Sequence, residues 1–172
     1  LGVMGSNLAR NIANKKFKIN VYNRTTSETK EFVEKYGNKY ISGSKSLKEL
    51  VNNLSKPRKI IIMVKAGKPV DSVISKISPL LSKNDILIDC GNSHYKDTKE
   101  RYLKLKKKEI HFVGCGVSGG EEGALNGPSL MPGGSKYAWN NIKDIFKKIA
   151  AKDFSGKPCV THIGEDEAGH YV

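Results

Sequence analysis

The sequence predicts a doubly wound α/β fold, built on a mainly parallel sheet with an extra αβ unit at its C-terminal end. Three observations indicate this class. Short apolar runs alternate with helical segments throughout, which is the pattern of βαβ units. Glycines cluster where the apolar runs end, and no linker or internal repeat divides the 172 residues. We therefore expect one domain spanning residues 1–172.

The predicted strands are rich in β-branched or aromatic residues and are bounded by Gly, Asn, Asp or Lys. They span residues 19–22, 60–64, 86–89 and 110–113, and a short additional strand is expected at 39–41. In an open α/β sheet, ligands bind beyond the carboxyl ends of such strands. The residues that follow each strand are therefore the candidates for function.

The predicted crossover helices carry apolar residues at positions i, i+3, i+4 and i+7, so each presents one apolar stripe to the sheet. Ser135 follows a glycine pair and is a suitable N-cap for the last of them. The three stripes are Leu47/Leu50/Val51/Leu54, Val70/Val73/Ile74/Ile77 and Ile142/Ile145/Phe146/Ile149.

The chain is strongly basic, with 30 Lys and Arg against 17 Asp and Glu, a net charge of +13. This charge favours phosphorylated ligands and permits nonspecific nucleic-acid contact. The densest lysine run, 104–108, has no interleaved aromatic residues, so we expect a solvated helix face and no nucleic-acid partner.

The cysteines and histidines indicate neither a disulfide framework nor a metal site. Cys90, Cys115 and Cys159 are odd in number and widely spaced, and the four histidines lack metal-ligand spacing. A reducing, cytoplasmic location is expected, and no apolar stretch is long enough for a membrane span.

The chain opens on LGVMG, in which Gly2 and Gly5 fit the last two glycines of a Rossmann-type G-x-G-x-x-G fingerprint. An acidic residue that binds an NAD ribose is expected about 20 residues later, but the chain carries Arg24, 24 − 5 = 19 residues after Gly5. Because an arginine suits a 2′-phosphate, the spacing predicts NADP. The alternative is a mobile surface arginine. The first glycine would precede Leu1, so we expect a chain that starts inside or just after its first strand.

Three other strand ends carry candidate ligand-binding residues. Lys65, followed by Ala66 and Gly67, could reach a phosphate or ribose, although a plain turn explains the same letters. Asn92 could orient a carboxamide or a substrate hydroxyl, or could cap the next helix. Ser118, Gly119 and Gly120 could form an anion-binding concavity for a carboxylate, or a glycine hinge. Glu121 and Glu122 are expected in a first helical turn, without a catalytic role.

Taken in order, these motifs resemble the 6-phosphogluconate dehydrogenase family over essentially the whole chain. The stretches that carry the resemblance are LGVMG, YNRT, IDCGNS, GVSGG and GPSLMPGG. The resemblance implies a set of binding residues. Leu1, Gly2, Val3, Met4 and Gly5 would bind the NADP pyrophosphate; Asn23, Arg24 and Thr25 the 2′-phosphate; Val64, Lys65 and Ala66 the nucleoside; Asn92 both cofactor and sugar; and Ser118, Gly119 and Gly120 the carboxylate end of 6-phosphogluconate.

The resemblance also implies the reaction, in which 6-phosphogluconate is oxidised by NADP and decarboxylated to ribulose 5-phosphate in the pentose phosphate pathway and gluconate utilization. The family's catalytic lysine and glutamate follow a stretch matched here by residues 167–172, so both are expected beyond Val172. We therefore expect a cofactor-binding domain truncated at both ends, without the large helical domain, and inactive alone. The full-length enzyme is expected to be a homodimer.

Two alternatives remain open at this level. One is an NADP-dependent β-hydroxyacid dehydrogenase that acts on another acid. The other is a nonenzymatic basic module that binds nucleotides or nucleic acid.

Overall fold

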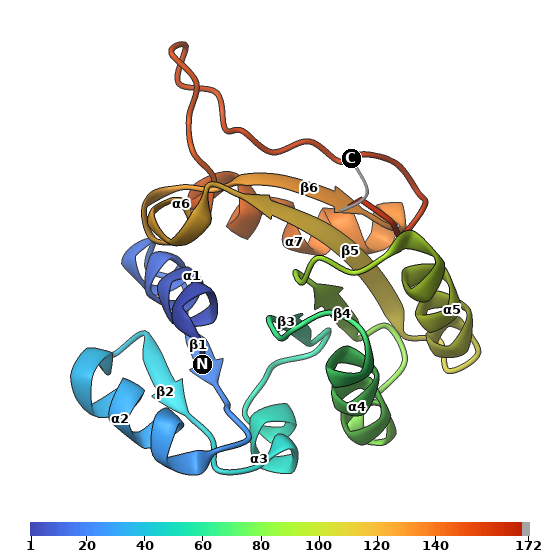
Figure 1. Ribbon diagram of the computed structural model, residues 1–172, viewed down its shortest axis with the longest axis horizontal. Helices are drawn as coiled ribbons and strands as arrows, with labels where there is room; N and C mark the ends of the chain where they lie inside the picture. The colour runs from blue at the N-terminus through green and yellow to red at the C-terminus, as the bar shows by residue number, and fades with distance from the viewer. Residues whose placement is uncertain (170–172) are drawn as a thin grey trace.

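The computed structural model describes residues 1–169, so His170, Tyr171 and Val172 of the predicted 167–172 stretch lie outside the described residues. Helices and strands alternate as the sequence predicts (Figure 1). The elements are α1 (Val3–Asn14), β1 (Ile19–Val21), α2 (Thr26–Tyr36), β2 (Ile41–Gly43), α3 (Leu47–Asn52), β3 (Lys59–Ile62), α4 (Lys68–Ile77), the 3-10 turn η1 (Ser78–Leu80), β4 (Ile86–Asp89), α5 (Tyr95–Lys106), β5 (His111–Ser118), α6 (Gly120–Asn126), β6 (Ser129–Gly133) and α7 (Lys136–Ile149).

The α/β class and the mainly parallel pairing are confirmed, but the strands form two sheets and not one. β1 pairs with β2 in parallel, and the second sheet has the order β3-β4-β5-β6. Among residues 1–169 no strand joins β1 to β3, so both are edge strands. They border a cavity of about 830 Å³ lined mostly by apolar side chains, among them Leu8, Ile12, Ile62 and Phe146.

The C-terminal strands differ most from the prediction. β5 continues to Ser118, five residues beyond the predicted end at 113, because it pairs antiparallel with β6 from Cys115↔Pro132 to Ser118↔Ser129. β6 itself was not predicted, since Pro132 and Gly133 argue against a strand. The proline is tolerated because β6 lies at the edge of its sheet. β2 is also shifted, from the predicted 39–41 to 41–43.

The predicted apolar stripes pack as expected on opposite faces of the larger sheet. Leu50 of the first stripe and Ile74 of the second share one core with Leu87 of β4, while Ile142 of the third stripe shares the other core with Ile88. A third core joins α1 and α2 to the small sheet. Ser135 caps α7 as predicted, because its hydroxyl oxygen accepts a hydrogen bond from the N–H of Ala138.

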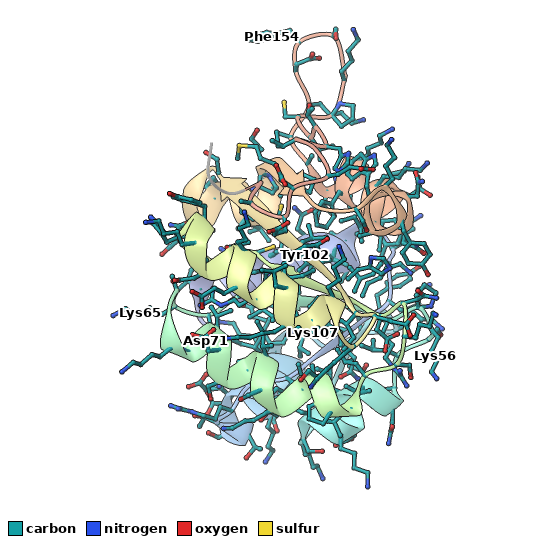
Figure 2. All side chains as sticks on the ribbon, turned by 90° about the vertical axis from the view of Figure 1, so that its right-hand side faces the viewer. Lys56, Lys65, Asp71, Tyr102, Lys107 and Phe154 are labelled. Atoms are coloured by element: carbon teal, nitrogen blue, oxygen red, sulfur yellow. The ribbon has the colours of Figure 1, made fainter. Side chains whose placement is uncertain are left out.

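The segment after α7 returns along β6 and crosses to β5. Single-residue bridges join it to the sheet at Leu130↔Val160, Gly133↔Gly164 and Gly114↔Ala168. Before these bridges, residues 152–158 form a loop that projects from the body (Figure 1), and its side chain Phe154 is fully exposed (Figure 2). Within the part of the chain that the structure describes, no helix has the length and apolarity to cross a membrane.

Candidate functional site

The carboxyl ends of β3, β4 and β5 meet at one edge of the larger sheet. The parallel registers Ile62↔Asp89 and Asp89↔Gly114 place the loops after β3 and β4 beside each other. The apolar cavity is lined by residues from separate parts of the chain, including Met63 and Val64 at the end of β3. Of the predicted cofactor residues, its lining includes Leu1, Gly5, Asn23, Arg24, Thr25 and Val64.

The start of α1 is open on the side where a ligand would approach. Gly2 is the N-cap, no side chain caps the helix, and the first turn contains no acidic residue. A Cβ built on Gly2 would meet no described atom within 4 Å, and one on Gly5 would make ordinary contact with Met63 at 3.5 Å. The fold itself therefore does not need glycine at position 2. Free N–H groups at the start of a twelve-residue helix suit an anion.

The loop after β1 presents an exposed Arg24 from a fixed backbone. The N–H of Asn23 donates to the hydroxyl of Thr29 at 2.9 Å, and its side-chain amide donates to Glu28 Oε2 at 2.6 Å. The Asn23 side chain also accepts from the amino group of Leu1. Glu28, which sequence analysis missed, also lines the cavity and adds a negative charge to the region of Arg24. The sequence could have indicated it, because Glu28 is the acidic residue in the first turn of α2, the helix that follows Arg24.

The loops after β3 and β4 touch through their backbones. A Cβ on Gly91 would lie 2.9 Å from the carbonyl oxygen of Val64, so only glycine fits this approach. Asn92 is exposed on the same loop. The side chain that caps α5 is His94, which accepts from the N–H of Lys96, so the alternative role of Asn92 as the helix cap is wrong.

Lys65 and Ala66 do not line the cavity. Lys65 is exposed and extends away from the body (Figure 2). Gly67 has φ of +86°, which favours glycine, and it is the N-cap of α4. The residues after β3 therefore do form a turn that leads into α4, as the alternative interpretation expects. The contact of Lys65 with a nucleoside stays a prediction.

Ser118, Gly119 and Gly120 form the exposed junction between β5 and α6. The φ angles of Gly119 and Gly120 are +128° and +61°, so the backbone needs glycine there. The junction lies beside α1, because Asn7 of α1 donates to the carbonyl oxygen of Glu121 at 2.9 Å. Glu121 and Glu122 lie in the first turn of α6, as predicted. These residues can act both as the glycine hinge between β5 and α6 and as a binding site for a carboxylate, so both predictions stay open.

The cysteines are free thiols, and Cys90, two residues before Asn92, is buried. A hydrogen bond with Cys115, together with burial, raises the pKa of Cys90 well above its ordinary value. Cys90 is therefore not a thiolate nucleophile at neutral pH. Within residues 1–169 no group of His, Cys, Asp and Glu is arranged to hold a metal ion.

Comparisons with known proteins agree on one family. The family model described as the NAD binding domain of 6-phosphogluconate dehydrogenase matches residues 1–164. The chain is 53% identical to the NADP(+)-dependent, decarboxylating 6-phosphogluconate dehydrogenase of Bacillus subtilis, over 100% of this chain and 36% of that protein. The human decarboxylating enzyme gives the same three figures, 53%, 100% and 36%.

Solved structures extend the comparison to the fold. The 6-phosphogluconate dehydrogenase of Plasmodium falciparum, solved alone and with NADP+ or 6-phosphogluconate, superimposes with a TM-score of 0.92 at 47% identity, covering 99% of this chain and 37% of that one. The 3-hydroxyisobutyrate dehydrogenase of Mycobacterium tuberculosis superimposes with a TM-score of 0.81, but at 19% identity it shares the fold alone, over 99% of this chain and 54% of that one. The chain thus spans about a third of the length of the curated relatives it matches.

Proposed function

The chain belongs to the 6-phosphogluconate dehydrogenase family, where it matches the NAD binding domain, and from this premise we propose that it forms the NADP-binding part of a decarboxylating 6-phosphogluconate dehydrogenase. When bound, NADP accepts a hydride from the sugar acid. The full-length protein would convert 6-phosphogluconate to ribulose 5-phosphate and CO₂ in the pentose phosphate pathway. Because the chain spans about a third of the length of its relatives, we propose this reaction for the full-length protein and not for the chain alone.

The observation that carries the proposal is that the uncapped start of α1 lies beside the loop that presents Arg24, where the amino group of Leu1 donates to the side-chain oxygen of Asn23. Arg24 and Gly5 line the cavity together, and Gly2 leaves open space before the first turn of α1. Backbone N–H groups there would hold the pyrophosphate. The planar guanidinium of Arg24 would donate to the 2′-phosphate, which NADH lacks.

The substrate would lie next to the cofactor along the same edge of the sheet. Asn92 offers both a donor and an acceptor at the end of β4, and Ser118 offers a hydroxyl at the end of β5. The N–H groups of Gly119 and Gly120 would help Ser118 to hold the carboxylate end of 6-phosphogluconate. We propose in addition that the full-length enzyme is a homodimer and works in the cytoplasm, where three free cysteines would stay reduced.

The test is a titration of the chain with NADPH and NADH side by side at one near-physiological salt concentration, repeated with Arg24→Asp. We expect tighter binding of NADPH, and loss of that preference in the variant, because an aspartate would repel the 2′-phosphate. NADH affinity should change little, since it carries no group for Arg24 to hold.

Lys157→Asp is the matched control. It makes the same change in net charge on the projecting loop, away from the cavity lining. Equal loss of NADPH binding in both variants would mean that overall charge attracts the cofactor, and would contradict the role of Arg24. An unchanged preference in Arg24→Asp would contradict it as well.

A further inference from the structure

We propose that Arg101 is a positioning residue for the cofactor site, holding the loops after β3 and β4 in register from inside the fold. The inference rests on the proposed function, because it concerns loops assigned to cofactor contact. Arg101 lies on α5, 3% exposed, and was not singled out in the sequence. Arginine is seldom buried this completely unless it is paired.

The guanidinium of Arg101 binds both loops at once. Its Nη2 donates to the carbonyl oxygen of Gly67 at 3.2 Å, in the loop after β3. Its Nη1 donates to the hydroxyl of Ser93 at 3.0 Å, in the loop after β4. Its Nε donates to Asp71 Oδ1 of α4 at 2.7 Å, which lowers the pKa of that carboxyl. Figure 2 shows Asp71 on α4, the helix beside α5.

Asp89 completes the network from within the sheet. It is fully buried at the end of β4, and its Oδ2 lies 3.6 Å from Arg101 Nη1. The same carboxylate accepts the N–H of Gly91 at 3.0 Å and the hydroxyl of Ser93 at 2.6 Å. Arg101 thus supplies the countercharge for the aspartate that shapes the turn around Asn92. A buried carboxylate without such a partner would be costly.

The anchored residues flank those proposed to contact the cofactor. Asn92 lies between two residues held by Asp89, and residues 64–66 immediately precede Gly67. The close approach of Gly91 to the carbonyl of Val64 joins the two loops on their other side. A change at Arg101 would therefore move both contact segments together. The fork of an arginine donates in several fixed directions, which the single ammonium of a lysine cannot reproduce.

The chain offers a matched control at the opposite end of β4. Arg58 Nη1 lies 2.8 Å from Oδ2 of the fully buried Asp85, and Arg58 Nε donates to the carbonyl of Val51 at 2.8 Å. This pair is also a buried Arg–Asp contact with several hydrogen bonds. It lies at the amino end of the strand, away from the proposed site. Arg58→Lys should therefore weaken the fold without touching the two loops.

The experiment compares Arg101→Lys with Arg58→Lys in the 172-residue chain. Urea unfolding measures stability, amide hydrogen exchange without cofactor measures order in residues 64–68 and 90–94, and titration measures NADPH affinity. We expect both variants to lose stability. Only Arg101→Lys should increase exchange in both loops, by about tenfold or more, and weaken NADPH binding by a similar factor.

Asp71→Asn provides a milder second variant in case Arg101→Lys does not fold. Asp71 is half exposed, and its substitution removes the charge that holds Arg101 Nε while leaving the Asp89 contact. We expect faster exchange in the same loops and a smaller loss of NADPH affinity. Unchanged exchange in these loops, or equal acceleration in Arg58→Lys, would overturn the proposal. If the wild-type chain fails to bind NADPH, the proposed function is contradicted, while the exchange data still decide the role of Arg101.

Discussion

Substituting Gly2 by alanine separates the needs of the fold from the needs of the ligand. The backbone of Gly2 has φ of −63° and ψ of 174°, which any residue adopts, and its Cβ would meet no described atom within 4 Å. Replacing a glycine at such a site stabilises a protein by about 0.4–1 kcal/mol through the unfolded chain. The weaker N-capping of alanine opposes this gain by a similar amount. We therefore expect the free energy of unfolding to change by less than about 1 kcal/mol.

Cofactor affinity, in contrast to stability, should fall clearly in Gly2→Ala. The new methyl group would occupy the space before the first turn of α1, where we place the pyrophosphate. Losing one hydrogen bond to a charged group costs about 1.5–3 kcal/mol, which corresponds to a roughly 10- to 150-fold increase in the dissociation constant. NADPH and NADH share the pyrophosphate, so both should weaken by the same factor. Arg24→Asp, in contrast, should affect NADPH alone.

The assay pairs nucleotide titrations at fixed salt with urea unfolding of Gly2→Ala. Gly123→Ala in α6 is the control, because its Cβ would make ordinary contact with the carbonyl oxygen of Ser118 at 3.5 Å. That variant should bind NADPH as the parent does. Unchanged affinity in Gly2→Ala would refute the idea that a ligand approaches this glycine. A loss of stability well above 1 kcal/mol would show that the fold itself requires it.

Three further outcomes test the packing around the site. Gly91→Ala should lose about 1–3 kcal/mol in urea unfolding, because its Cβ would lie 2.9 Å from the carbonyl oxygen of Val64; an unchanged midpoint would contradict the close approach. Asp85→Asn should cost about 3 kcal/mol at pH 7 by leaving Arg58 unpaired. Burial raises the pKa of Asp85, but hydrogen bonds from neighbouring backbone and from Arg58 outweigh it and hold the pKa below the ordinary 3.8. The contribution of this carboxylate is thus full above that value and lost as the pH falls through the lowered pKa, so the unfolding free energies of wild type and variant should begin to converge as the pH falls below about 4. Phe154→Ser should change stability by less than about 0.5 kcal/mol in thermal melts, since the side chain is fully exposed.

The sequence predicted the elements whose patterns are local. Strands such as 86–89 match because a run of branched residues between polar ones is a complete local signal. β6 was missed because its pairing with β5 depends on residues far apart in the chain, while Pro132 and Gly133 locally disfavour a strand. The extension of β5 was missed for the same reason. The division into two sheets is a property of pairing, which periodicity does not report.

The site followed the same rule. Gly2, Gly5 and Arg24 could be singled out because a fixed spacing relates them, and Gly5 and Arg24 both line one cavity, while their contact with a cofactor stays a prediction. The buried pair of Arg101 and Asp89 was not predicted, because an arginine within a lysine-rich helix is expected to lie on a solvated face. Only the tertiary fold turns Arg101 inward, onto groups eight to 34 residues away.

We infer two roles for the glycines of this chain, close packing and cofactor binding, which the sequence alone does not distinguish. In GPSLMPGG, a Cβ on Gly127 would lie 2.8 Å from the Cα of Ala151, and one on Gly133 would lie 2.5 Å from the N of Gly169. These glycines let the C-terminal segment lie against β6, so the stretch that helps to identify the family is a packing motif at those positions. A Cβ on Gly2 would meet nothing within 4 Å in the described chain, and we propose that this space receives the cofactor. On this proposal the resemblance combines glycines that the packing of the fold requires with a glycine that the cofactor requires, and only substitution of the latter should weaken binding while the fold stays intact.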